Sequence, residues 1–260
     1  DCHQNINSIK LLPLYGYGKV KERSQLYYNQ IKKLYKKIFK RADRIFFICH
    51  SQGSVVTTFL VSYLIKYNII IPAEQAITIL SMAGIHHGPY MDIPGDLYSA
   101  TSELFQFAQI HTALAQEYLS IVEELLYDNH IIFIAIASFN DEVVPLYSAI
   151  LQHFDAAPGL YRGIWYKALT DVFFKQLFSS IMTKASGNHD LLLHISGLFR
   201  GSIFNRKLFH SEIHHDITPY ENALNVSYQH DTINAIKLKS NINNRRNYQS
   251  FILFNSLLTD

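Results

Sequence analysis

Four short apolar segments, the first of them only moderately apolar, most constrain how this chain of 260 residues can fold. They cover residues 6–14, Arg44–Ile48, Ala76–Met82 and Ile131–Ala137. Strands that do not alternate polar and apolar residues are typical of a parallel sheet covered on both faces. Helical apolar spacing is found in the stretches between them, over residues 20–40, 54–67 and 101–127. The alternation predicts an α/β fold with right-handed crossovers.

Length and composition favour one large domain. The chain is 48% hydrophobic with a formal net charge of +2, which excludes a disordered chain and gives no basic field for nucleic acid. Cys2 and Cys49 lie too far apart for a CxxC metal site, and no disulfide framework is expected. No strand is predicted in residues 147–200. The predicted organisation is a domain over 1–236, cap-like helical insertions at about 90–128 and 150–200, and a polar tail over 237–260 with a terminal helix.

The sequence Cys49-His50-Ser51-Gln52-Gly53 stands between the second apolar segment and a helix that is apolar almost all round. A strained strand-to-helix turn in this position lifts a serine hydroxyl above the sheet edge and requires small neighbours, such as Gly53 and Cys49. Ser51 is therefore the predicted nucleophile. It starts a helix, where backbone amides favour an oxyanion, and the amide of Gln52 is the predicted donor. The alternative is an ordinary serine turn that caps a helix.

A serine alcohol needs a base, and the base needs an acid that orients it. Asp141 stands just past the carboxyl end of the fourth apolar segment, where ligand sites of open α/β sheets lie. It is the predicted acid; a loop-capping aspartate is the alternative interpretation, and Glu142 is a weaker rival. His210 is the predicted base, because it would end a strand over residues 202–209, and His189 is the alternative base.

At this point the sequence resembles the α/β-hydrolase superfamily, and within it the lipase/esterase-like serine hydrolases of the fungal and eukaryotic type. The resemblance covers about residues 12–230 and rests on the four pieces Cys49–Gly53, Met82–Pro89, Asn140–Ala149 and His210–Ile213. It implies a mostly parallel sheet with helices on both faces and helical caps. It also implies a catalytic triad of Ser51, His210 and Asp141, with His50, Gly53 and His86 in pocket or structural roles.

Members of this superfamily usually carry a His-Gly segment after an early strand, and no such segment precedes Ser51. We expect the early strands to lie upstream of Asp1, or else the oxyanion hole to be incomplete. No metal site is expected. Adjacent His86 and His87 on an extended segment point to opposite sides, and His214-His215-Asp216 has no partners at matching spacing.

The sequence thus predicts a serine hydrolase that cleaves hydrophobic or lipid-like carboxylic esters through an acyl-enzyme, without a cofactor. One alternative is an inactive hydrolase scaffold that serves as a binding or interaction protein. Another is a peripheral membrane protein whose tail binds acidic lipid through Lys237, Lys239, Arg245 and Arg246, with residues 251–258 as an apolar face. The lack of a disulfide framework and of a visible leader favours the cytoplasm or a membrane surface.

Overall fold

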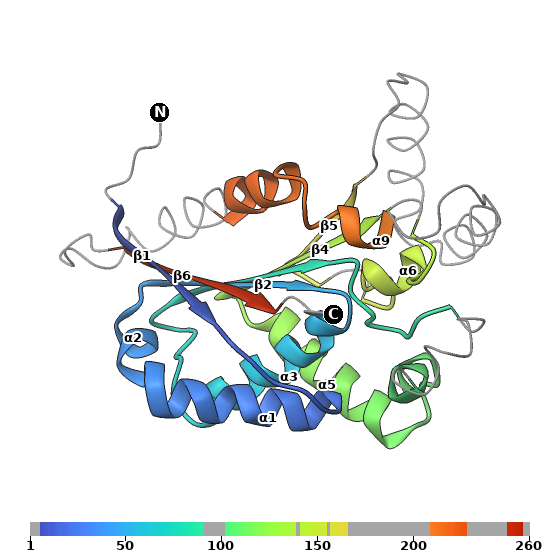
Figure 1. Cartoon of the computed structure of the whole chain (residues 1–260), viewed down its shortest axis with the longest axis horizontal. Coiled ribbons are helices and arrows are strands. Elements are labelled where there is room, and N and C mark those ends of the chain that lie inside the picture. The colour runs from blue at the N-terminus through green and yellow to red at the C-terminus, as the bar shows by residue number, and fades with distance from the viewer. Residues whose placement is uncertain are drawn as a thin grey trace.

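The computed structural model describes residues 6–90, 102–138, 141–154, 157–165, 209–227 and 249–256. Its centre is a six-stranded sheet in the order β1-β6-β2-β3-β4-β5, in which every neighbouring pair is parallel (Figure 1). The strands are β1 (Ile6–Pro13), β2 (Arg44–His50), β3 (Ala76–Met82), β4 (Ile131–Ser138), β5 (Leu160–Trp165) and β6 (Gln249–Ser256). The first four coincide with the four apolar segments, so the predicted parallel α/β sheet is confirmed.

Helices cover one face of this sheet, drawn below it in Figure 1. They are α1 (Val20–Gln30), α3 (Gln52–Lys66) and α5 (Ala113–Tyr127). α1 continues through the π-helical segment η1 (Ile31–Tyr35) into α2 (Lys36–Arg41). The core between these helices and the strands includes Phe47, Phe59 and Tyr118, which are all completely buried. α3 is apolar almost all round because it is packed against β2, α1 and α5.

The predicted helix over residues 101–127 is interrupted. Ser102–Ala108 form a 3-10 helix, η2, and α5 begins only after Thr112, whose hydroxyl accepts a hydrogen bond from the amide of Ala115 (3.2 Å). A threonine in this position satisfies one of the free amides of the first helical turn and so fixes where the helix starts. α5 packs against α3 and β4, so it belongs to the layer that covers the sheet, whereas residues 90–128 are predicted to form a cap.

The opposite face carries a smaller core and shorter helices. α9 (Phe209–Glu212) and a helix over residues 218–227 lie above it in Figure 1. Met82, Ile136, Trp165 and Ile213 are among the buried residues of this second cluster. The helix over 218–227 agrees with the predicted start near Pro219. Most of the strand expected over residues 202–209 lies outside the described residues, and Phe209 begins α9 instead.

β5 lies within the region where no strand is predicted. It is an edge strand, and five of its six residues are only half-buried, so its sequence has no continuous apolar run. Arg162 in its middle donates hydrogen bonds to the carbonyl oxygens of Ile150 and Leu151 (2.7 and 2.9 Å). A strand that carries an arginine and a glycine lacks the apolar signal by which buried strands are found. The other half of the predicted second cap, residues 166–200, lies outside the described residues.

β6 stands where a terminal helix is predicted. It lies between β1 and β2 and pairs with both, so that Leu253 is in register with Leu11 on one side and with Phe46 on the other. A central strand gains backbone hydrogen bonds on both edges, and this pairing overrides the local pattern of the sequence. Residues 237–248 and 257–260 lie outside the described residues. Within the described part of the chain, no helix is long and apolar enough to cross a lipid bilayer.

Removal of β6 is expected to unfold the sheet. A chain that ends at residue 248 leaves β1 without its pairing partner and exposes one edge of β2, so we expect loss of the cooperative thermal transition. The measurement is circular dichroism or differential scanning fluorimetry. A chain that ends at Ser256 keeps the whole strand and is the control, which should unfold near the full-length temperature. Equal stability of all three chains would show that β6 is not an integral strand.

Candidate functional site

Ser51 lies at the turn between β2 and α3 and has a strained backbone. Its φ of 53° and ψ of −127° are a conformation that residues with a side chain rarely adopt. Its amide donates to the carbonyl oxygen of Met82 at the end of β3 (3.0 Å), and its carbonyl accepts from the amide of Ser54 (3.1 Å). The serine is therefore held at the carboxyl edge of the sheet, in the geometry of the nucleophile turn that the sequence predicts.

The structure brings the side chains of Ser51, His210 and Asp141 together. The Oγ of Ser51 is 2.8 Å from Nε2 of His210, and Nδ1 of His210 is 2.8 Å from Oδ2 of Asp141. The other carboxylate oxygen of Asp141 accepts hydrogen bonds from the amides of Val143 and Val144 (2.8 and 2.9 Å). With the carboxylate fixed by this turn, Nδ1 of His210 donates to it, and Nε2 is left to accept a hydrogen bond from the hydroxyl of Ser51.

The surroundings of His210 favour its protonated form. Burial by itself lowers the pKa of the imidazole. The charge of Asp141, its hydrogen bond and the charge of Glu142 outweigh burial, and the pKa is raised above its ordinary value of 6.5. The imidazole of His210 is therefore more basic than that of an isolated histidine. Glu142 itself is not hydrogen-bonded to the imidazole, and burial raises the pKa of its carboxyl.

His50 ties the backbone of His210 to the turn that holds Ser51. Its Nε2 donates to the carbonyl oxygen of His210 (2.6 Å), and its ring lies 4.7 Å, between centroids, from the rings of both His210 and His214. Burial, together with the charge of His210, lowers the pKa of His50 to about 3. The ring is therefore neutral, and because a carbonyl only accepts, its proton must be on Nε2. No sequence signal identifies this contact, because it depends on where α9 is placed.

His86 is buried beside Tyr118 of α5 and Phe133 of β4. Its two ring nitrogens contact the hydroxyls of Ser81 (2.8 Å) and Tyr118 (2.5 Å), and Ser81 donates to the hydroxyl of Ser54 in the first turn of α3 (2.9 Å). Burial lowers the pKa of His86 to about 3, so the ring is neutral. This buried chain of hydrogen bonds supports the first turn of α3. His86 therefore has a structural position and makes no contact with Ser51.

Two glycines lie close to this turn. Gly53 is buried in the first turn of α3. A Cβ atom on Gly84 would come within 2.3 Å of Oγ of Ser81 and 2.4 Å of Nε2 of His86, so only glycine fits there.

The structure also places Gln52, the predicted oxyanion donor. Gln52 is the first residue of α3, so its amide has no acceptor within the helix. The alternative base His189 lies outside the described residues.

Among the described residues, no three histidine, cysteine, aspartate or glutamate side chains are grouped so that they could hold a metal ion. Cys49, beside the turn, is fully buried, and burial raises the pKa of its thiol to about 12. The thiol donates to the carbonyl of Leu80 (3.2 Å) and stays protonated. Its environment is that of a structural thiol and not of a nucleophile.

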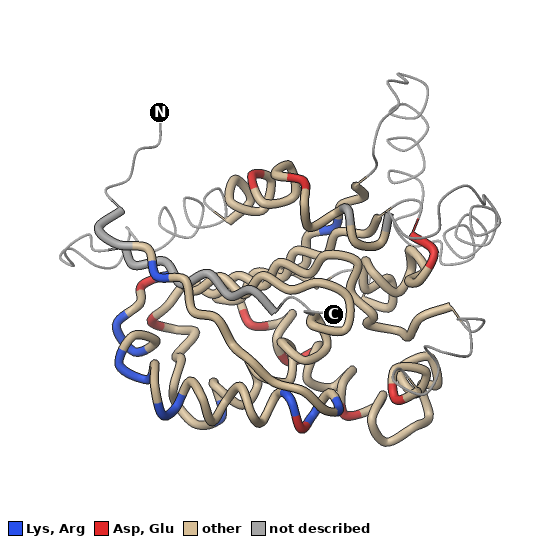
Figure 2. Tube along the Cα trace, in the orientation of Figure 1, with Lys and Arg blue, Asp and Glu red and all other residues tan. Residues whose placement is uncertain are grey.

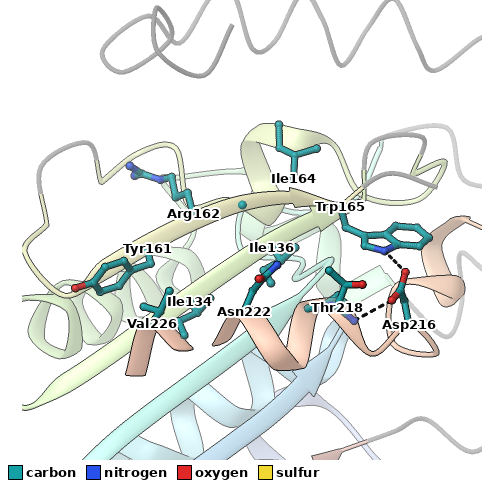
Figure 3. Close-up of a pocket in the computed structure, with 12 residues that line it drawn as sticks. Ile134, Ile136, Tyr161, Arg162, Ile164, Trp165, Asp216, Thr218, Asn222 and Val226 are labelled. Carbon is teal, nitrogen blue, oxygen red and sulfur yellow. Dashed lines mark hydrogen bonds between the residues drawn. The ribbon is translucent and has the colours of Figure 1, made fainter. Parts of the chain in front are cut away.

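A cavity of about 640 Å³ lies on the sheet face that carries α9 (Figure 3). Its floor is formed by Ile134 and Ile136 of β4, and Tyr161 and Trp165 of β5 stand at its two ends. Nε1 of Trp165 donates to Asp216 (2.8 Å), four residues beyond the end of α9. Neither Ser51 nor His210 nor Asp141 lines the cavity, so it is distinct from the cluster described above.

Comparison with known proteins identifies the family. A family model of the YMC0/YMC35 alpha/beta hydrolase domain matches residues 1–257. No curated protein matches the sequence. Among solved structures, the chain is similar to a lipase-esterase related protein from Clostridium acetobutylicum ATCC 824, with 14% identity over 66% of this chain and 80% of that chain and a TM-score of 0.34. Since the family match extends over nearly the whole chain, this protein belongs to the YMC0/YMC35 family of α/β-hydrolase domains.

Proposed function

We propose that this hydrolase cleaves carboxylic esters, with Ser51 as nucleophile, His210 as base and Asp141 as the orienting acid. The observation that carries the proposal is the unbroken chain of two 2.8 Å hydrogen bonds from the serine oxygen through the imidazole to the carboxylate. Three separate parts of the chain supply these groups: the turn after β2, the loop after β4, and α9. Such convergence on one strained serine has no evident structural purpose and supports a chemical one.

The proposed reaction begins when Nε2 of His210 takes the hydroxyl proton of Ser51 while Oγ attacks the ester carbonyl carbon. The imidazolium, stabilised by Asp141, then returns the proton to the leaving alkoxide as the ester C–O bond breaks. Water deprotonated by His210 releases the acid from the acyl-enzyme and restores the serine. The amide of Gln52, at the start of α3, is the proposed oxyanion donor. These steps need no cofactor.

The proposed substrates are esters with a hydrophobic or lipid-like acyl group. This part of the proposal rests on the resemblance to lipase/esterase-like hydrolases, and a series of p-nitrophenyl esters from acetate to palmitate tests it. A rise in kcat/KM with acyl length to an optimum beyond butyrate is the expected result. A preference for acetate would restrict the site to short esters.

Substitution Ser51→Ala is expected to abolish covalent labelling by a fluorophosphonate probe. It should also lower kcat/KM for p-nitrophenyl butyrate by at least about 10⁴-fold, because the attacking atom is gone. Ser211→Ala, which changes an exposed serine next to the proposed base, is the matched control and should keep full activity. A full-length protein that neither reacts with the probe nor cleaves any ester would favour the inactive binding scaffold.

The rate of probe labelling is expected to fall in acid with a midpoint above pH 6.5, because protonated His210 cannot accept the serine proton. In Asp141→Asn the midpoint should move to lower pH, since the carboxylate that raises the pKa of the base is neutral and burial then dominates. The rate on the plateau should fall by about 10⁴-fold. Glu142→Gln, which removes a more weakly acting charge, should give a smaller shift in the same direction. An unchanged midpoint in Asp141→Asn would contradict the assignment of the acid.

His50→Ala is expected to lower kcat by roughly 100-fold with little change in KM, because a shift of about 1 Å in the base is that costly. The matched variant His50→Gln keeps an N–H donor at a similar reach and should recover most of kcat. Thermal unfolding of both variants is measured alongside. If both lose activity in proportion to their loss of stability, the contact with the carbonyl of His210 serves the fold and not the positioning of the base.

A further inference from the structure

The outward side of α1, η1 and α2 is the most basic surface of the described chain. Six basic side chains, all exposed, occur within ten residues; they are Lys32, Lys33, Lys36, Lys37, Lys40 and Arg41. Figure 2 shows them gathered at the end of the molecule where α2 lies. The sequence has no acidic residue between Glu22 and Asp43. Within the described residues, no carboxylate forms an ion pair with any of the six.

Exposed apolar side chains run along the same helix. Leu26 and Leu34 are 40% and 60% exposed and lie eight residues apart, on one side of the helix. Between them Gln30 accepts a hydrogen bond from the amide of Tyr15 and donates one to its carbonyl, which holds Tyr15 beside the row. The Tyr15 side chain is 72% exposed. Lys33, Lys37 and Arg41, again at intervals of four, form the basic row next to these apolar groups.

This combination points to an anionic lipid surface as the partner. Clustered basic side chains are attracted to acidic headgroups, and apolar side chains among them gain free energy when they enter the headgroup boundary. The phosphates of a nucleic acid would bind the lysine side chains, but Leu26 and Leu34 would then face water or phosphate. Lysine also predominates over arginine, which suits a diffuse negative surface better than bidentate recognition of single phosphates.

Acidic groups flank this surface at two ends. Glu22, in the first turn of α1, lies one turn before Leu26, and its carboxylate accepts a hydrogen bond from the amide of Lys19. Asp43 follows α2 after Ala42, and Glu74 is next to Gln75, whose side chain donates to the carbonyl oxygens of Phe39 and Ala42. The basic row of Lys33, Lys37 and Arg41 lies between Glu22 and these two carboxylates in the sequence.

The basic residues of α2 lie at the opposite end of the sheet from the proposed active site. α2 leads into the amino end of β2 at Arg44, whereas Ser51 follows its carboxyl end, and seven residues of strand span about 23 Å. Binding there and hydrolysis of a soluble ester are separable properties.

We propose that the α1–α2 surface, defined by Leu26, Leu34, Tyr15 and the six basic residues above, docks this protein on anionic membranes. The proposal does not rest on the ester hydrolysis proposed above. It also differs from binding by the basic residues of the carboxyl-terminal tail, because β6 in that tail is a central strand of the sheet.

The test is co-sedimentation of the full-length protein with large vesicles of phosphatidylcholine that contain increasing phosphatidylserine. Binding should rise with phosphatidylserine and fall as sodium chloride is raised. Lys33→Gln/Lys37→Gln should weaken the partition coefficient by at least about tenfold. Lys19→Gln/Lys21→Gln removes two charges at the start of α1, where Lys21 is ion-paired with Glu117 (2.8 Å), and should have a much smaller effect.

A second pair of variants separates insertion from charge alone. Leu34→Ser should weaken binding, whereas Ile110→Ser, at a residue of nearly equal exposure (63% against 60%), should not. The Ser51→Ala variant should bind vesicles as the wild type does, so loss of ester hydrolysis leaves vesicle binding measurable.

Several outcomes would overturn the proposal. One is vesicle binding that does not depend on the content of phosphatidylserine. Another is an equal effect of the two lysine double substitutions. A third is loss of binding only when the tail residues Lys237, Lys239, Arg245 and Arg246 are changed. Tighter binding to single-stranded RNA than to vesicles, with Leu34→Ser unaffected, would assign the surface to nucleic acid instead.

Discussion

The strained conformation of Ser51 is the constraint on which the site depends. A residue with this φ and ψ costs about 1–3 kcal/mol, so the surrounding structure must hold it. The hydrogen bond from its amide to Met82 attaches it to β3, and the buried chain from Tyr118 through His86 and Ser81 holds the first turn of α3. The strand before the serine and the helix after it are both fixed in the core. The hydroxyl therefore has a defined position before any partner approaches it.

The histidines near this turn differ mainly in whether a carboxylate is hydrogen-bonded to them. His50 and His86 are both buried without such a bond, and the pKa of each is lowered to about 3. His210 is also buried, yet the carboxylate of Asp141 raises its pKa. The first two rings are neutral and act as hydrogen-bonding supports, whereas the third binds a proton more readily. The same side chain thus has a structural or a proposed chemical role according to its neighbour.

What the sequence could predict follows from how local each signal is. β2, β3 and β4 are continuous apolar runs, and the turn at Ser51 lies directly between one such run and a helix. The local sequence therefore predicts both these strands and this turn. The position of Asp141 follows in the same way from the end of β4. β5 carries no such signal, because it is an edge strand with Arg162 in its middle. β6 does contain the apolar run Phe251–Phe254, but the pattern of a short apolar run does not distinguish a buried strand from a buried helix segment. Its pairing with β1 and β2, which are distant in the sequence, identifies it as a strand.

The position of His210 shows a second limit of local patterns. It was expected at the end of a strand and lies on the four-residue helix α9, whose place is set by contacts with distant residues. One of these contacts is the hydrogen bond from His50 to the carbonyl oxygen of His210. Another is the burial of Ile213 in one cluster with Met82 and Ile136. Spacing along the chain could therefore nominate the residue but could not supply the element that carries it.

The parallel sheet also determines how the two proposed activities relate. Because every described strand runs in the same direction, all their carboxyl ends, and the loops that carry Ser51 and Asp141, meet at one edge. The connection from α2 to β2 must then lie at the other edge, and the basic residues of α2 lie there with it. A chain of this topology can bind a surface through these residues and keep the proposed active site at the other edge. Charge attraction at α2 and the proton transfer proposed at His210 are therefore separated by the length of β2, and a change in salt that weakens the first leaves the second intact.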